Sequence, residues 1–258
     1  MSVWSCLVAR ALAVWIALFS LAACGGPQSD CALMSCYQRA VGPLTVFAAA
    51  SLQPAFDKIS AQLHVDATFN YAGTQTLAAQ LAQGAEADVF ASADKTHMKT
   101  LLDAGLIAGA PEVFAHNRLE IAVAKGNPKG IHSLADLARP GLVVVLADPS
   151  VPAGKYAQQA LAKANVTVHP ASLEPQVTGV LSKVALGEAD AGIVYVSDVI
   201  TSQKVQGVPI PDSQNVVADY PIAALKNAQH NSTADAFIAF VLAPDGQSIL
   251  KAAGFEPA

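Results

Sequence analysis

The chain has 258 residues, of which 53% are hydrophobic and 14% are charged. This composition is sufficient for one large or two modest lobes with hydrophobic cores, and it excludes an intrinsically disordered chain. The formal net charge is -5, whereas a protein that binds nucleic acid needs basic surface to neutralise phosphates. The composition therefore argues against nucleic acid as a partner.

The N-terminus has the pattern of a secretory signal. Arg10 is followed by an apolar run over residues 11–23 that is too short for a permanent membrane span. We therefore assign residues 1–23 to a signal peptide. The run ends in LAAC followed by two glycines, which resembles the lipobox of bacterial lipoproteins and implies that Cys24 becomes the acylated N-terminus. The alternative is an ordinary signal cleavage near the same place, with Cys24 as an incidental thiol.

Residues 24–42 lack a periodic apolar pattern and contain Gly, Pro, Ser, Gln and Asp. This composition predicts a flexible tether between the membrane and a folded body, with no catalytic role. Cys31 and Cys36 lie in this segment, and outside the cytoplasm they could close a small disulfide loop. From residue 43 onward the sequence has no cysteine, which excludes cysteine nucleophiles and thiolate metal ligands from the folded body.

Strand-like and helical segments alternate from residue 44 to the end, which predicts an α/β protein with mostly parallel strands. The expected strands cover residues 44–49, 65–71, 87–94, 119–124, 142–147, 192–196 and 220–225. The expected helices cover residues 52–63, 76–83, 133–138, 154–164 and 175–186, one that Asp94 caps, and two that follow Ser232 and Pro244.

These segments fall into two groups, which predicts two lobes. Residues 109–117, GAPEVFAHN, are expected to form an irregular segment, so we place a lobe boundary near Asn117. Residues 208–217 contain two prolines and several turn formers, and we expect them to be a second crossing between the lobes. One lobe then comprises residues 43–116 together with residues 218–258, and the other comprises residues 117–217.

Ser51 lies in a turn between an expected strand and an expected helix. In open parallel α/β sheets, ligands bind beyond the carboxyl ends of the strands, where the first amides of each helix lack an intrahelical acceptor and attract anions. The simpler role for the Ser51 hydroxyl is to cap its own helix. Three further turns of this kind occur in YAGTQTLAAQ, DPSVPAGKYA and EPQVTGVL, and in the second of these we expect free amides at Val151, Ala153 and Gly154. Together the turns predict a cleft lined by uncharged donors.

Four segments, FAAASL, ADVFASAD, SVPAG and GIVYVSD, resemble those of periplasmic-type molybdate-binding proteins, the solute receptors of molybdate ABC importers. The similarity extends from about Thr45 to Phe255. It implies a type II periplasmic binding protein fold, in which two α/β lobes are joined by two crossing segments and a tetrahedral oxyanion is held in the cleft between them.

Carried over by position, the resemblance implies that five residues contact the ligand: Ser51, Thr74, Ala153, Val177 and Tyr195. Ser51 and Thr74 would supply hydroxyl and backbone N–H groups. Ala153 and Val177 would supply backbone N–H groups, and Tyr195 its phenol. Thr74 departs from the serine usual in the family and adds a methyl group, and Thr178 replaces an arginine common in the family. The resemblance implies no cofactor and no protein ligand to the metal, since molybdenum is bound only as its oxyanion.

The function that the resemblance implies is binding of molybdate or tungstate and delivery to the permease and ATPase of an ABC importer. We expect a monomer that is lipid-anchored to the outer face of the cytoplasmic membrane. The alternative is a receptor for another tetrahedral oxyanion, such as sulfate or phosphate. A secreted hydrolase with Ser51 as nucleophile is disfavoured, because the sequence has no GxSxG motif and marks no His or Asp as a partner. We therefore expect no enzymatic activity.

Overall fold

A computed structural model describes residues 43–258 of the chain. The expected signal peptide (residues 1–23), the expected acylation of Cys24, the tether (residues 24–42) and the pair Cys31 and Cys36 lie outside the described residues. Within residues 43–258, none of the helices is both long enough and apolar enough to cross a membrane.

The first lobe is built on a mixed sheet, so the prediction of mostly parallel strands is wrong: antiparallel pairings with β4 (Glu112–Ala124) and β9 (Val217–Ala224) join the parallel ones. β1 (Pro43–Ala49) lies between β2 (Asp66–Ala72) and β3 (Val89–Ala91) and is parallel to both, and β9 pairs antiparallel with β3. Leu44 and Val46 of β1 face one hydrophobic core, whereas Phe47 faces a second core on the other side of the sheet. This burial on both faces explains why the strand is a continuous apolar run in the sequence.

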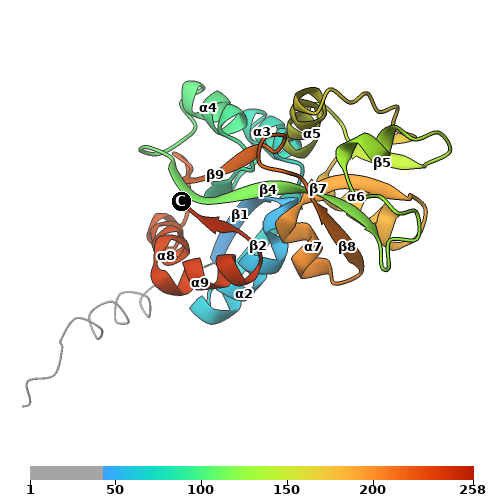
Figure 1. Ribbon diagram of the computed structural model, residues 1–258. Coiled ribbons are helices and arrows are strands. Elements are labelled where there is room, and N and C mark those ends of the chain that lie inside the picture. The colour runs from blue at the N-terminus through green and yellow to red at the C-terminus, as the bar shows by residue number, and fades with distance from the viewer. Residues whose placement is uncertain (1–42) are drawn as a thin grey trace, which may run out of the picture.

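Helices cover both faces of this sheet (Figure 1). α2 (Gln53–Leu63) packs on one face together with α8 (Asn231–Leu242) and α9 (Pro244–Ala252). Phe56 of α2 meets Phe237 of α8 edge to face, with 5.4 Å between the ring centroids. On the other face, α3 (Thr74–Ala82) and α4 (Lys95–Asp103) bury Leu77 and Leu101. The chain therefore returns to the first lobe for its last helices.

The second lobe carries a smaller sheet. β7 (Ala191–Tyr195) is parallel to β5 (Val144–Ala147), which pairs with β6 (Ser172–Glu174). β4 (Glu112–Ala124) pairs antiparallel with β7 and with β8 (Val205–Pro209). The helices of this lobe are α5 (Pro152–Lys163), α6 (Val177–Ala185), α7 (Val196–Ser202) and the 3-10 turn η2 (Leu134–Ala138).

β4 runs through both lobes and joins them. Its first half pairs with β9 as far as Arg118, and its second half pairs with β7 from Leu119 onward, while β10 (Glu256–Pro257) adds to the first half. The prediction of an irregular segment over residues 109–117 is wrong, because β4 begins at Glu112 and buries Phe114 completely. The change of partner after Arg118 lies next to the lobe boundary that we predicted near Asn117. The exact lobe boundaries stay a prediction.

Other differences from the predicted elements are confined to element ends and short elements. Of the strand expected over residues 87–94, only β3 is formed. Asp94 instead begins α4 as its N-cap and accepts a hydrogen bond from the His97 amide at 2.9 Å, which confirms the predicted cap. α5 begins at Pro152, because proline suits the first helical position, where an N–H would have no partner. β6 is absent from the prediction, since a strand of three residues leaves no periodic signal.

Candidate functional site

A small cavity lies between the lobes, where strand ends and helix N-termini meet. Its volume is about 20 Å³, more than the roughly 10–15 Å³ that one water molecule needs. In the described part of the chain, the 3-10 turn η1 (Ala50–Leu52), α3, α5 and α6 all begin at this cavity. The lining consists of Ala49, Ala50, Ser51, Ala72, Gly73, Thr74, Ala93, Val151, Pro152, Ala153, Gln176, Val177 and Tyr195. The structure thus brings together all of the residues that we predicted to contact a ligand.

Ser51 reaches the cavity from η1, which connects β1 to α2. The residue is buried, and its Oγ lies 2.9 Å from the Oη of Tyr220. Neither η1 nor α2 has a side-chain cap within the described residues, so the simpler role of Ser51 as a helix cap is wrong. The Ser51 hydroxyl is instead hydrogen-bonded to Tyr220 of β9, at the edge of the cavity.

Thr74 is the first residue of α3 and is completely buried. Its Oγ1 accepts a hydrogen bond from the Ala93 amide at 3.1 Å. A hydroxyl has one proton and two lone pairs, so this contact leaves the Thr74 proton available for donation into the cavity. Because Ala93 follows β3, the same contact ties two turns of the first lobe together.

Two helices of the second lobe present backbone amides to the cavity. α5 begins after the N-cap Val151, and α6 begins after the N-cap Gln176, and neither N-cap side chain accepts a hydrogen bond from its helix. The first-turn amides of Ala153 and Val177 therefore have no acceptor within their helices. The Val151 amide, which we expected to be free, donates to the Asp148 carbonyl at 2.8 Å, so that prediction is wrong.

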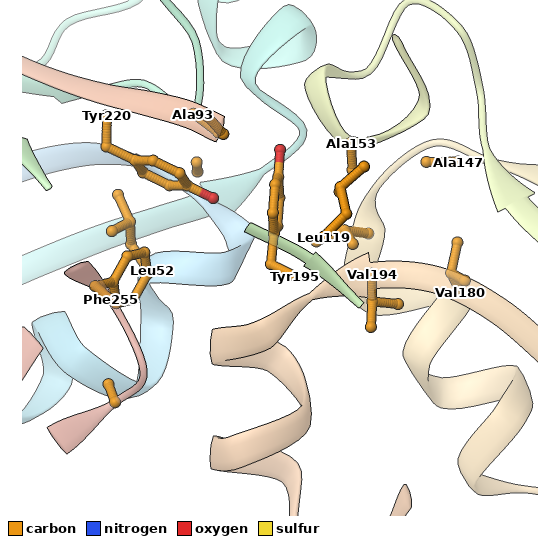
Figure 2. Packing of buried hydrophobic residues seen from close by; sticks show 14 of the residues in the cluster. Leu52, Ala93, Leu119, Ala147, Ala153, Val180, Val194, Tyr195, Tyr220 and Phe255 are labelled. Atoms are coloured by element: carbon orange, nitrogen blue, oxygen red, sulfur yellow. The ribbon is translucent and has the colours of Figure 1, made fainter. Parts of the chain in front are cut away.

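Tyr195 closes the cavity from the end of β7. Its hydroxyl is buried and lies near the Tyr220 side chain, but it makes no hydrogen bond of good geometry among residues 43–258. Figure 2 shows this hydroxyl directed between Ala93 and Ala153, toward the junction of the lobes. Burial raises the pKa of Tyr195 well above its ordinary value, so the phenol keeps its proton and can donate it. A buried hydroxyl without a partner costs free energy, which favours a ligand atom as its partner here.

Charged side chains stay out of the cavity lining that the structure describes. Asp198 lies behind Tyr195, where its carboxylate accepts a hydrogen bond from the Tyr195 amide at 3.0 Å, and burial raises the pKa of Asp198 to about 7. Asp94 caps α4, and Asp148 accepts hydrogen bonds from the amide and hydroxyl of Ser150 in a turn. All three aspartates therefore serve as caps or turn residues, as expected.

The lobes are in contact beside the cavity. Gln75 of α3 donates from Nε2 to the Pro175 carbonyl at 2.9 Å, and Lys155 of α5 donates from Nζ to the Oγ1 of Thr96 in α4 at 3.0 Å. A Cβ atom at Gly73 would lie 2.6 Å from the same Pro175 oxygen and 2.5 Å from the Nε2 of Gln75, which bonds that oxygen. Residue 73 therefore has no room for a side chain while the lobes are together.

Residues 44–256 match a family described as bacterial extracellular solute-binding protein. The chain belongs to this family. It is a solute-binding protein and not an enzyme. A relative in Mycobacterium tuberculosis, named Molybdate-binding protein ModA, is 47% identical over 218 residues, which cover 82% of this chain and 84% of the relative. A ModA from Escherichia coli is 33% identical over 257 residues, which cover 93% of this chain and 97% of the relative.

Solved structures share the fold of this solute-binding protein. The periplasmic molybdate-binding protein of Azotobacter vinelandii has a TM-score of 0.74 at 22% identity and covers 83% of this chain and 99% of its own. The sulfate-binding protein SubI from Mycobacterium tuberculosis has a TM-score of 0.76 at 22% identity, over 84% of this chain and 87% of its own. These similarities show the fold alone, and they confirm the predicted periplasmic binding protein fold.

Tyr220 is the residue near the site that the sequence analysis missed. It lies 169 positions from Ser51, whose hydroxyl it contacts. In the sequence, Tyr220 begins an ordinary expected strand with no turn motif beside it. No local signal marks it, because its importance depends on a contact between distant parts of the solute-binding protein.

Replacing Asp198 by Asn is expected to change how the stability of this solute-binding protein depends on pH. A carboxyl whose folded-state pKa is raised to about 7 stabilises the fold fully below its unfolded pKa of about 4, and this contribution is lost as the pH rises through 7. The Asp198→Asn variant keeps an oxygen for the Tyr195 amide but loses this titration. From about pH 5 to about pH 8, the free energy of unfolding of the variant should rise by roughly 2 kcal/mol relative to that of the wild-type protein, as measured by denaturant unfolding at each pH. An equal difference at both pH values would contradict this assignment.

Proposed function

We propose that this solute-binding protein is an extracytoplasmic receptor that binds molybdate, or tungstate of nearly the same size, and delivers it to the permease and ATPase of an ABC importer. The convergence of uncharged donors from both lobes on one small cavity is the observation that carries the proposal. The names of the relatives that are 47% and 33% identical support molybdate as the ligand. We infer that the receptor acts as a monomer and uses no cofactor.

The proposed donors come from both lobes. The first lobe contributes the hydroxyl and amide groups of Ser51 and Thr74, and the second contributes the amides of Ala153 and Val177 and the phenol of Tyr195. Each hydrogen bond to a charged group contributes roughly 1.5–3 kcal/mol, so several of them suffice for tight binding. The positive ends of α5 and α6 add to this attraction, and no countercharge has to be buried with the ion.

Donors of this kind distinguish a fully ionised oxyanion from a protonated one. Hydrogen phosphate carries its own O–H, which would have to face a group that also offers a proton. The arrangement therefore disfavours phosphate. Sulfate has the same charge and shape as molybdate, so the separation of these two ligands depends on the size of the cavity.

A thermal melting scan with molybdate, tungstate, sulfate and phosphate tests the proposal. A ligand present at about 100 times its dissociation constant adds about 2.7 kcal/mol to the free energy of unfolding. We expect molybdate and tungstate to raise the melting temperature and phosphate to leave it unchanged. Stabilisation by sulfate alone would favour the alternative receptor. Stabilisation by none of the four ions would contradict oxyanion binding.

We propose that the ligand bridges the lobes and favours their closure by a hinge at Asn117 and residues 208–217. The contacts of Gly73 and Gln75 with Pro175 support this proposal, because they form only when the lobes meet. In a Gly73→Ala variant the added methyl group would hold the lobes apart, so we expect molybdate to bind about 10-fold more weakly, as measured by calorimetric titration.

Gly179→Ala is the matched control for this test. A Cβ atom at Gly179 would lie 3.2 Å or more from Glu174, a residue of the same lobe, so closure is unaffected. The control is expected to bind molybdate nearly as well as the wild-type protein. Equal affinities of the Gly73→Ala variant and the wild-type protein would refute the role of lobe closure.

The family places the protein outside the cytoplasm, and we propose that an acyl group on Cys24 anchors it to the membrane. The LAAC sequence before two glycines supports this. When the Cys24→Ala variant is produced in a bacterial cell, the protein is expected to move from the membrane fraction to the soluble fraction and to lose labelling by radioactive palmitate. Cys31→Ala, the control, should stay with the membrane. Membrane association of the Cys24→Ala variant with label retained would contradict the proposed anchor.

A further inference from the structure

Tyr220 lies behind Ser51, outside the lining of the cavity. Its ring is completely buried and packs edge to face against Tyr195, Phe114 and Phe255, with centroid distances of 5.8, 6.3 and 5.3 Å. Figure 2 shows the Tyr220 ring beside Tyr195, with its hydroxyl directed toward the Tyr195 side of the site. Packing by several rings holds the Tyr220 hydroxyl in one place, 2.9 Å from the Ser51 Oγ.

The hydrogen bond between the two hydroxyls has a favoured direction. A phenol is a stronger acid than an aliphatic alcohol, so Tyr220 is the better donor and the Ser51 oxygen is the better acceptor. Ser51 lines the cavity and Tyr220 does not, so only the serine can address a ligand directly.

Accepting this bond restricts what Ser51 can do. The serine hydroxyl has a single proton, and when its oxygen accepts from Tyr220 that proton is left to point toward the cavity. Without the bond, the hydroxyl can rotate and present either its proton or its lone pairs to a ligand. The same logic holds at Thr74, whose oxygen already accepts from the Ala93 amide.

We propose that Tyr220 is a positioning residue, which fixes the Ser51 hydroxyl as a hydrogen-bond donor to the bound oxyanion. The inference rests on the proposed function, since it concerns the same site. It assigns to β9, a strand of the first lobe, a part in ligand selection. The Tyr220 hydroxyl lies outside the cavity lining and reaches the ligand through Ser51, whereas the Tyr220 ring packs on Tyr195. Removal of the hydroxyl alone therefore has a distinctive energetic signature.

A double-mutant cycle tests that signature. The full chain is titrated with molybdate in a calorimeter as the wild-type protein, Tyr220→Phe, Ser51→Ala and the double variant. Tyr220→Phe removes one oxygen and keeps the packed ring. We expect the Kd to rise about 5- to 20-fold for Tyr220→Phe and about 10- to 100-fold for Ser51→Ala. In the Ser51→Ala background, adding Tyr220→Phe is expected to change the Kd by less than about 2-fold, because the hydroxyl it positions is gone.

Tyr71→Phe is the matched control, because it removes the same atom from a residue whose hydroxyl donates to Asp57 at 2.8 Å on the surface. Its Kd should equal that of the wild-type protein. An unchanged Kd for Tyr220→Phe, or the same fold-loss from this substitution in both backgrounds, would overturn the positioning role. A general loss of stability cancels in the comparison of backgrounds. Failure of the wild-type protein to bind molybdate would instead overturn the proposed function itself, so the two failures are distinguishable.

Discussion

A doubly charged ion can be held without a countercharge only if enough dipoles are already fixed around it, because removing a charge from water costs more than one hydrogen bond returns. In this chain, the dipoles are fixed where strands run into helices. Within residues 43–258, neither η1, α3, α5 nor α6 has a side-chain cap, and all four begin at the cavity. No capping side chain therefore occupies the amides at these four starts, and they are available to a ligand.

β4 provides a common frame for both halves of the site. Tyr220 of β9 pairs with Ala115 in the first half of β4, and Tyr195 of β7 pairs with Leu119 in its second half. The two tyrosine rings therefore meet where the strand passes from one lobe to the other, with 5.8 Å between their centroids. Because Tyr220 also holds Ser51, a hydroxyl of the first lobe and the phenol of the second are both set by strands that pair with β4. Ligand contacts and the connection between the lobes thus share one structural element.

The turns were predictable because a strand that runs into a helix leaves a local signature, an apolar run followed by hydroxyl residues, glycine or proline. The turns that hold Ser51, Thr74, Ala153 and Val177 follow from such signatures, and the family resemblance supplies the assignment of these residues and Tyr195 as ligand contacts. The strand over residues 112–117 was not predictable, because turn formers precede it and its burial depends on β9, a strand from a distant part of the chain. The contact between Tyr220 and Ser51 spans 169 positions, and no periodicity reports a contact of that kind.

Selection among anions cannot come from the overall charge of the molecule. The net charge of -5 and the carboxyl of Asp198 behind Tyr195 act against every anion alike, and exposed charges are screened beyond about 8–10 Å at physiological salt. Cavity size separates ions of the same charge and shape, and discrimination between protonation states must come from the direction in which each contacting group offers its proton. The Thr74 oxygen accepts a hydrogen bond from the Ala93 amide, and in the arrangement that we propose the Ser51 oxygen accepts one from the Tyr220 phenol. A hydroxyl held in this way has only its proton to offer, so in this arrangement internal hydrogen bonds that never touch the ligand decide which protonation state of an oxyanion the cavity accepts.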